Sequence, residues 1–321
     1  MHVPDGLLDL RTASTTAVLS LSALTAALRR LRLGLPRRRI PLMGLAAAFL
    51  FTAQMLNFPV AGGTSGHLLG AVLASVLLGP SPAIVVMTAV ILTQCLLFAD
   101  GGLLALGANV FNMAIVGVLG GYAVYKVISR VLPDRRGILV AAAFASWCST
   151  VLASICCAAE LAWSGVAPWG LVFPAMATVH MLIGIGEAAI TTLVIAAIMK
   201  ARPDLVDPTT SAAPPSASRF VAAYGLAATF GVLLFALPFA SSWPDGLERV
   251  GEVLGFAGRT AAVRALPAPM AEYQLPGLGS ATAATSAAGF VGTLIAFALA
   301  YVLAAALAPK APAEGPRDRA A

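Results

Sequence analysis

The stretch LVFPAMATVHMLIGIGEAAITTLVIAAIM, residues 171–199, contains only one charged side chain, that of Glu187. A helix needs roughly 20 predominantly apolar residues to cross the hydrocarbon core of a bilayer, and this run is longer than that. Its apolar residues are continuous and do not alternate with a period of two, which favours a helix over a strand of a membrane barrel. The stretch therefore predicts a membrane-spanning helix.

The composition of the whole chain has the same character. Hydrophobic residues make up 59% of the chain and charged residues 11%, whereas soluble domains contain about 25% charged residues. The candidate spans are residues 12–28, 41–57, 67–79, 83–98, 108–125, 137–163, 171–199, 220–240 and 281–308. The third and fourth are short and are separated by the turn sequence GPSP, so hydropathy leaves open whether they are half-buried, bent or tilted. We expect an all-α, polytopic membrane helical bundle.

Residues 201–219, ARPDLVDPTTSAAPPSASR, have the composition of a linker, rich in Pro, Ser, Ala and Thr. They divide a seven-span N-terminal domain, residues 1–200, from a C-terminal domain, residues 220–321, with two spans. An external segment between the last two spans contains PDGLERVGEVLGF, which predicts a short helix with Asp245 near its start.

The distribution of positive charge predicts the orientation. If the N-terminus is outside, the cytoplasmic segments contain every Lys and Arg except four, which are Arg11, Arg249, Arg259 and Arg264. Since cytoplasmic loops are enriched in these residues, we expect a multi-pass protein of the bacterial cytoplasmic membrane with its N-terminus outside. Asp5 and Asp9 precede the first span and the arginine cluster follows it, unlike in a cleaved signal peptide. The topology explains the basic charge, so no nucleic-acid partner is expected.

Met1 and His2 form a candidate chelating unit at the outer surface. Bulky His2 should prevent removal of Met1, which then keeps a free α-amine. This amine, the amide nitrogen of residue 2 and the His2 imidazole can close fused chelate rings. One further nitrogen completes a square-planar set, a geometry associated with Ni(II) or Cu(II), whereas Mg and Ca prefer oxygen ligands.

His67 is the candidate for the fourth nitrogen. It lies at the outer mouth of the third span, on the same side of the membrane as His2, after three glycines that permit a sharp turn. The alternative is that neither histidine binds metal, since a histidine at position 2 usually has no function and a loop histidine is usually solvated.

His180 and Glu187 lie two helical turns apart and share one face of the seventh span. An ionisable residue deep in a span is a functional hypothesis by default. The structural alternative is that His180 forms a hydrogen bond between helices and that Glu187 pairs with His180, Asn109 or Asn112.

Four motifs together resemble the CbiM/NikM family, the substrate-binding membrane components of energy-coupling-factor transporters for cobalt and nickel. These motifs are MHVPDG, GGTSGHLLGAVLASVLLGP, DGGLLALGANVFNMAIVGVLGGY and HMLIGIGEAAIT. The C-terminal part, with PDGLERVGEVLGF and YQLPGLGS, resembles the small N component of the same systems, the PDGLE-type domain. The chain thus resembles a fusion of the two components.

The resemblance implies that the metal is held by the Met1 amine, by the main-chain nitrogen and side chain of His2, and by His67. It implies that residues 1–10 tuck into the bundle from outside. Candidates to surround the ligands are Asp5, Asn57, Thr64, Ser65, His180 and Glu187. The resemblance also implies two partners besides membrane lipid, a CbiQ/NikQ-like transmembrane coupling component and a CbiO/NikO-like cytoplasmic ATPase. The ion is the transported substrate, and no cofactor is expected.

Three functions compete on the sequence. The favoured one is ATP-driven uptake of nickel or cobalt, and because the chain has no P-loop motif the ATPase must be a separate protein. The alternative is a secondary, proton-coupled transporter using Glu160 and Glu187, against which the lack of an obvious inverted repeat counts. A membrane metalloenzyme is disfavoured because no catalytic motif occurs and the four-nitrogen site has no use for an open position. The ligand types leave nickel and cobalt open, but square-planar nitrogen and the fused arrangement favour nickel.

Overall fold

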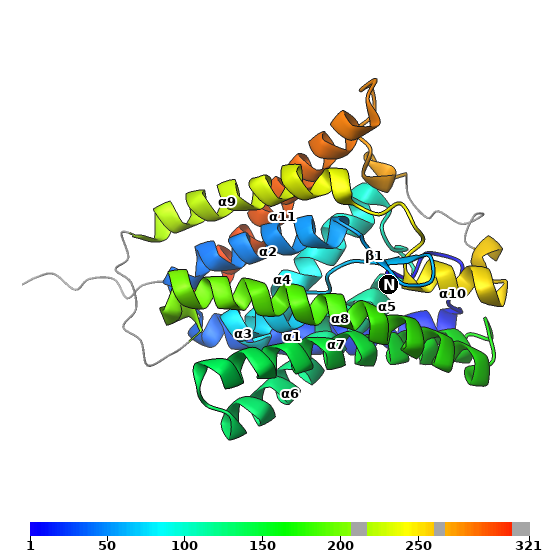
Figure 1. Cartoon of the computed structure of the whole chain (residues 1–321), viewed down its shortest axis with the longest axis horizontal. Helices are drawn as coiled ribbons and strands as arrows, with labels where there is room; N and C mark the ends of the chain where they lie inside the picture. Colours follow the sequence, from blue (N-terminus) through cyan, green and yellow to red (C-terminus); the bar gives the residue numbers. More distant parts are fainter. Residues whose placement is uncertain (207–216, 260–266, 310–321) are drawn as a thin grey trace, which may run out of the picture.

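The computed structural model describes residues 1–206, 217–259 and 267–309. In these ranges the chain is a bundle of helices whose axes run mostly along the longest dimension of the molecule (Figure 1). The longer helices are α1 (Leu10–Gly34), α2 (Ile40–Met55), α4 (Pro80–Thr93), α6 (Gly117–Val131), α7 (Arg135–Trp163), α8 (Trp169–Ala201), α9 (Ala217–Ala236) and α11 (Ala281–Leu307). The shorter elements are α3 (Ala71–Leu78), α5 (Leu106–Asn109), α10 (Gly246–Leu254), β1 (Phe58–Val60) and β2 (Thr64–Gly66).

Six helical stretches among the described residues are long and apolar enough to cross a membrane. They are Pro80–Phe98, Leu106–Val131, Arg135–Trp163, Trp169–Ala201, Ala222–Phe239 and Ala281–Leu307. The prediction of a mostly helical, multi-pass membrane protein is therefore confirmed. The first three predicted spans, in contrast, correspond to α1, α2 and α3, which are not among these six.

Helix α3 is too short to be a membrane crossing. It contains eight residues and so measures about 12 Å, against a hydrocarbon core of about 30 Å. It begins after Gly70, whose positive φ of 73° suits glycine, and ends at Gly79, where α4 turns back. The predicted span over 67–79 is therefore a short helix in a hairpin with α4.

Helix α1 has the surface that a helix in lipid requires, although it contains several arginines. Its face toward the bundle consists of small and hydroxyl residues such as Thr16 and Ser20, and the Ser20 hydroxyl donates to the carbonyl of Gly107 at 2.7 Å. Large apolar side chains such as Leu21 and Leu33 point outward and are 66% and 86% exposed. Small residues inside and leucines outside are typical of helices packed in a membrane.

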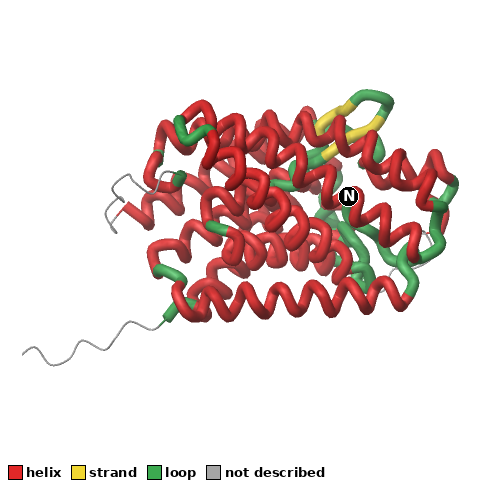
Figure 2. Tube along the Cα trace, turned by 90° about the horizontal axis from the view of Figure 1, so that it is seen from below, coloured by secondary structure: helices red, strands yellow, loops and turns green. Residues whose placement is uncertain are grey.

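A small antiparallel hairpin of β1 and β2 was not part of the all-α prediction (Figure 2). Phe58 pairs with Gly66, and Val60 with Thr64. The turn between them contains Gly62 and Gly63, both with positive φ. The hairpin ends one residue before His67 and so sets the position of that side chain.

The C-terminal domain packs against the side of the N-terminal domain. Helix α11 lies along α2, where the hydroxyls of Thr52 and Thr293 are 2.8 Å apart. A Cβ added to Gly292 would lie 2.1 Å from the ring of Phe51, so glycine is needed for this close approach. Helix α10, which follows α9 in the chain, lies at the end of the bundle that holds the N-terminus (Figure 1).

Candidate metal site

The N-terminal residues are buried inside the end of the bundle. Met1 is 5% exposed and Val3 is completely buried. Asn109 fixes Val3 on both sides, since its side-chain oxygen accepts from the Val3 N–H at 2.7 Å and its amide group donates to the Val3 carbonyl at 3.0 Å. The Gly102 N–H also donates to this carbonyl, and a Cβ on Gly102 would lie 2.1 Å from the Asp5 carboxylate. The segment thus tucks inward, as the resemblance implied.

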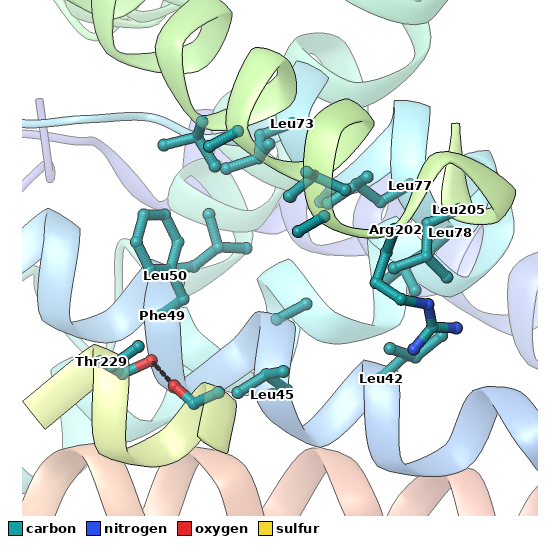
Figure 3. Close-up of a pocket in the computed structure, with 18 of the residues that line it drawn as sticks. Leu42, Leu45, Phe49, Leu50, Leu73, Leu77, Leu78, Arg202, Leu205 and Thr229 are labelled. Atoms are coloured by element: carbon teal, nitrogen blue, oxygen red, sulfur yellow. Dashed lines mark hydrogen bonds between the residues drawn. The ribbon is translucent and has the colours of Figure 1, made fainter. Parts of the chain in front are cut away.

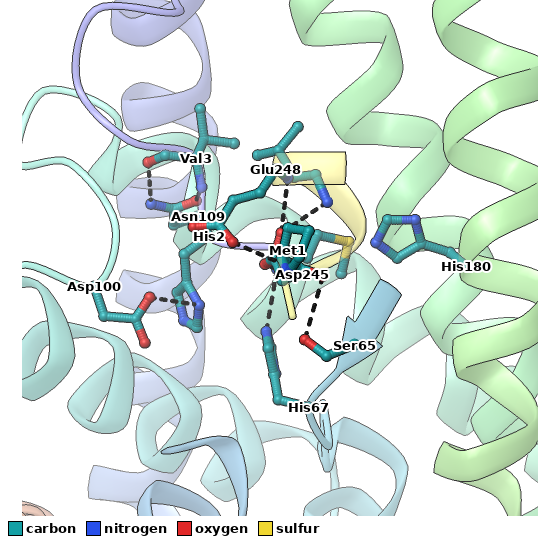
Figure 4. A network of polar contacts seen from close by, with 12 residues as sticks. Met1, His2, Val3, Ser65, His67, Asp100, Asn109, His180, Asp245 and Glu248 are labelled. Carbon is teal, nitrogen blue, oxygen red and sulfur yellow. Dashed lines mark hydrogen bonds and ion pairs between the residues drawn. The ribbon is translucent and has the colours of Figure 1, made fainter. Parts of the chain in front are cut away.

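Met1, His2 and His67 meet at this buried terminus (Figure 4). The α-amine nitrogen of Met1 lies 3.1 Å from Nε2 of His67. The rings of His2 and His67 are stacked, with centroids 5.2 Å apart. Two residues separated by 66 positions are therefore brought to hydrogen-bond distance, and a third lies beside them.

The His2 ring is held at both of its nitrogens. Nδ1 lies 3.1 Å from a carboxylate oxygen of Asp100, and Nε2 lies 3.1 Å from the side-chain oxygen of Gln94. The other oxygen of Asp100 accepts a hydrogen bond from the hydroxyl of Tyr273 at 2.5 Å. The contacts with Asp100 and Gln94 fix the orientation of the His2 ring in this structure.

Asp245 forms an ion pair with the Met1 amine through its Oδ2 atom. Its other oxygen, Oδ1, caps α10 by accepting from the N–H groups of Leu247 and Glu248 at 2.8 and 2.9 Å. The Glu248 side chain accepts from the Asp245 N–H at 2.9 Å, which completes a capping box. The cap therefore fixes the direction in which the second oxygen of Asp245 points.

The remaining residues of PDGLE place this cap against the N-terminal domain. The carbonyl of Pro244 accepts from the Ser65 N–H at 2.8 Å. A Cβ on Gly246 would lie 2.7 Å from Cε1 of His180, so only glycine lets α10 approach α8 this closely. Leu247 is 3% exposed and packs in the core of this end of the bundle. Each residue of the motif thus has a local structural role.

The C-terminal domain therefore reaches both residues of the candidate chelating unit. It contacts Met1 directly through Asp245 and His2 through Tyr273 and Asp100. These contacts were missed by sequence reasoning, which identified Asp245 only as the start of a short helix. No sequence pattern links Asp100 or Gln94 to His2, because both lie more than 90 positions away from it in the chain.

The electrostatics leave neutral imidazoles beside a charged pair. Burial, together with the charge of the nearby amine, lowers the pKa of His67 to about 3. Burial also lowers the pKa of His2, against the opposing effect of Asp100. Burial alone would lower the pKa of the Met1 amine, but the charge of Asp245 and its hydrogen bond hold it above its ordinary value. Burial would likewise raise the pKa of Asp245, but the amine holds it well below the usual range. Both imidazoles are therefore neutral at neutral pH, each with one N–H and one nitrogen whose lone pair can bind a metal.

Glu187 has a different role from those expected. Its carboxylate accepts from the N–H groups of Leu69 and Gly70 at 2.5 and 2.8 Å. The expected pairing with His180, Asn109 or Asn112 was wrong, since Asn109 holds Val3 and Asn112 donates to Glu160 at 2.7 Å. The physical reason is that the buried N–H groups of Leu69 and Gly70, just before α3 begins, need an acceptor. Glu187 thus anchors the loop that follows His67.

His180 lies beside the candidate ligands. Its Nδ1 donates to the carbonyl of Met176 at 2.8 Å, and its buried Nε2 has no hydrogen-bond partner among the described residues. A cavity of about 10 Å³ is lined by Met1, His67, His180 and Asp245, among others. This volume is close to that of one water-sized species.

The other candidate residues hold the external segment and the tucked terminus. The hydroxyl of Ser65 donates to the carbonyl of Trp243 at 2.7 Å, and the carbonyl of Asn57 accepts from the Ser241 N–H at 2.8 Å. The Asp5 carboxylate accepts from the Leu104 N–H at 2.8 Å. Thr64 is buried in β2.

The chain is similar to known proteins over most of its length. Residues 2–205 match the family described as "Cobalt uptake substrate-specific transmembrane region", CbiM, and residues 219–309 match the PDGLE domain. The chain is 40% identical over 305 residues to a "Putative fused nickel transport protein NikMN" of Archaeoglobus fulgidus, covering 94% of this chain and 98% of that protein. It is 34% identical over 231 residues to a "Fused nickel transport protein NikMN" of Rhodobacter capsulatus, covering 67% and 66%. A "Crystal Structure of an Truncated Transition metal Transporter" is 31% identical with a TM-score of 0.58, covering 63% of this chain and 99% of that chain.

Proposed function

The chain belongs to the CbiM family and carries a PDGLE domain, and we propose that it is the substrate-binding component of an ATP-driven importer of nickel or cobalt. The observation that carries this proposal is the meeting of the Met1 amine with His67 and His2 in one buried cluster. Nitrogen donors of this kind suit a late transition metal and not Mg or Ca. The names of the fused relatives refer to nickel transport, which agrees with this chemistry.

The distances in the cluster suit a planar nitrogen set. With metal–nitrogen bonds of about 2.0 Å, adjacent corners of a square plane are about 2.8 Å apart. The Met1 amine and Nε2 of His67 are 3.1 Å apart, so both can bind one ion after a small adjustment. The His2 chelate ring uses Nδ1, the nitrogen nearer to the backbone, which Asp100 contacts in this structure. Asp100 therefore has to yield this position when metal binds.

The PDGLE domain, in this proposal, prepares the site for the ion. Asp245 orients the amine, and an amine bound to a metal still has N–H groups that can donate to this carboxylate. Tyr273 holds Asp100, which in turn orients the His2 ring. Through these two contacts, the C-terminal domain would help to position both residues of the proposed chelate.

The energy source and the orientation belong to the same proposal. The chain has no P-loop motif, so a transmembrane coupling component and a cytoplasmic ATPase would supply the energy, and the site would face outward. The charge bias of the loops supports an outside N-terminus in the cytoplasmic membrane. For the ion, we favour nickel because square-planar nitrogen sets are typical of Ni(II).

Metal analysis of the purified chain, loaded with equal nickel and cobalt, tests this function. We expect one ion per chain, mostly nickel, in a diamagnetic state because square-planar Ni(II) is low-spin. Purified chain alone should show no ATP hydrolysis. Uptake in cells should persist when the proton gradient is collapsed and ATP is kept, whereas loss of uptake under those conditions would support the secondary-transporter alternative.

A further inference from the structure

An apolar groove lies between the two domains at the arginine-rich end of the bundle, opposite the end that holds Met1 (Figure 3). Its volume is about 540 Å³, within the range of about 300–1,000 Å³ that is usual for ligand sites. Residues of four helices line it, among them Phe49 of α2, Leu77 of α3, Ala197 of α8 and Ala228 of α9. The hydroxyl of Thr229, a rare polar group in the wall, already donates to the carbonyl of Gly225 at 2.8 Å.

The groove separates α9 from α3 and α8, so α9 rests on the N-terminal domain mainly through α2. Only 11% of the span Ala222–Phe239 is buried within the chain. A continuous apolar space of this size between helices in a membrane has to be filled by hydrocarbon, because water would have no hydrogen-bond partners there. The occupant must therefore be an apolar chain.

Charge and composition favour a lipid over the other candidate occupants. The arginines at the mouth of the groove are complementary to an anionic headgroup, which a phospholipid supplies and the apolar flank of a transmembrane helix does not. Residues 207–216 and 310–321 of this chain are rich in polar, charged and proline residues and would not fill an apolar space.

The mouth of the groove carries positive charge. Arg202 lines it, with its guanidinium group near Leu42 (Figure 3). Asp204 accepts from Nε and Nη2 of Arg202, both at 2.7 Å, and since a guanidinium has five N–H donors, others remain. Arg39 donates to the carbonyl of Leu78, another residue of the wall, at 2.9 Å. A phosphate beside these two arginines would be bound by charge-assisted hydrogen bonds.

We propose that this groove binds one acyl chain of a membrane phospholipid, whose phosphate is held at the mouth by Arg202 and Arg39. The lipid fills the space between the domains and seats α9 against α3 and α8. The site is independent of the proposed metal site, since it lies at the opposite end of the bundle and shares no residue with it.

Photo-crosslinking in lipid nanodiscs tests this site, with a phospholipid that carries a diazirine on its acyl chain. Peptides containing Leu77 and Ala228 should be labelled, and excess unlabelled phospholipid should compete. The variants Ala197→Phe and Ala228→Phe fill the groove and should lower this labelling at least fivefold. The matched controls are Leu193→Phe and Ala227→Phe, which place the same side chain at exposed positions of α8 and α9 outside the groove.

A second arm tests the headgroup. Mass spectrometry of the detergent-purified chain should find a retained phospholipid, and Arg202→Ala should lower its amount severalfold while metal binding is unchanged. Retention of a diacylglycerol probe, which has no phosphate, should not respond to Arg202→Ala. Equal labelling in the groove-filling and control variants, or phospholipid retention that is unaffected by all of these substitutions, would show bulk lipid contact only and overturn the proposal.

Discussion

The carboxylate of Asp245, in the PDGLE domain, is paired with the α-amine of Met1 at the start of the chain. The two groups are 244 positions apart in the sequence, and each is fixed by its own surroundings. Asp245 is held by the capping box of α10, and the N-terminal segment is held by Asn109. The two domains therefore meet at the residue that the proposed metal chelate requires.

Replacing Asp245 tests whether this pair prepares the site. Asp245→Asn removes the charge but keeps a good N-cap for α10. We expect metal affinity to fall about 10–100-fold, as is typical when a partner of a metal ligand is lost. Isothermal titration measures the change. Glu252→Gln, which alters an exposed carboxylate on the same helix, is the control, and equal affinity in the two variants would remove Asp245 from the site.

Substitution of His67 and of His180 distinguishes a proposed metal ligand from a residue that only lies beside the site. His67→Ala should abolish metal binding and uptake, with normal expression and membrane insertion, because it removes one strong nitrogen donor. His180→Ala should instead lower stability or leave partial activity, because it loses the bond to Met176 and the packing against Gly246. Metal content and uptake should be measured together. Normal uptake by His67→Ala would place the site elsewhere.

The spacing between the amine and the His2 imidazole is a test of the chelate itself. Insertion of Leu between Met1 and His2 should abolish binding, because it changes the ring pattern and enlarges a buried terminus. Insertion of Ala should be tolerated at least in part, since removal of Met1 would restore an amine next to histidine. An N-terminal tag should abolish binding and a C-terminal tag should not. Equal binding by all four variants would rule out the amine as a ligand.

Proton release should identify the ligand atoms. The amine binds its proton tightly because its pKa is raised, whereas His67, with a pKa of about 3, has no proton to lose. Coordination by the amine and the deprotonated amide should release about two protons, so affinity should rise about 100-fold per pH unit until the amine itself deprotonates. Calorimetry in buffers of different ionisation enthalpy counts the protons. A count near zero would mean that imidazoles bind the metal without the terminus.

Glu187 should act on the site through the loop that carries His67. Glu187→Gln keeps the shape but leaves one side-chain oxygen to accept from two backbone N–H groups. We expect a loss of about 1–3 kcal/mol in stability together with weaker metal binding, measured by thermal unfolding and titration. Thr191→Val is a control one turn further along α8, because the buried Thr191 hydroxyl has no partner. Matching behaviour of the two variants would contradict the anchoring role.

The sequence alone was enough for the class of protein. Long apolar runs with few charges have one stable arrangement in a bilayer, so the helical membrane character followed directly from composition and length. The same reasoning failed for α3, because hydropathy does not register the two glycines with positive φ that shorten this helix. The β1–β2 hairpin was not predicted for the same reason, because it depends on local backbone conformation.

Some residues of the candidate site could likewise be predicted from the sequence, and others could not. Met1 and His2 could be selected from their chemistry, because adjacent residues fix the chelate spacing, and His67 could be selected from the glycines before it. Asp245, Asp100 and Tyr273 could not be selected, since their contacts join segments between which the sequence contains no common spacing. Such contacts exist only when helix packing brings α10 and the residue 94–102 region to the buried terminus. Local covalent geometry therefore determines the spacing of the proposed donors of Met1 and His2, and the tertiary fold determines the charges that hold them.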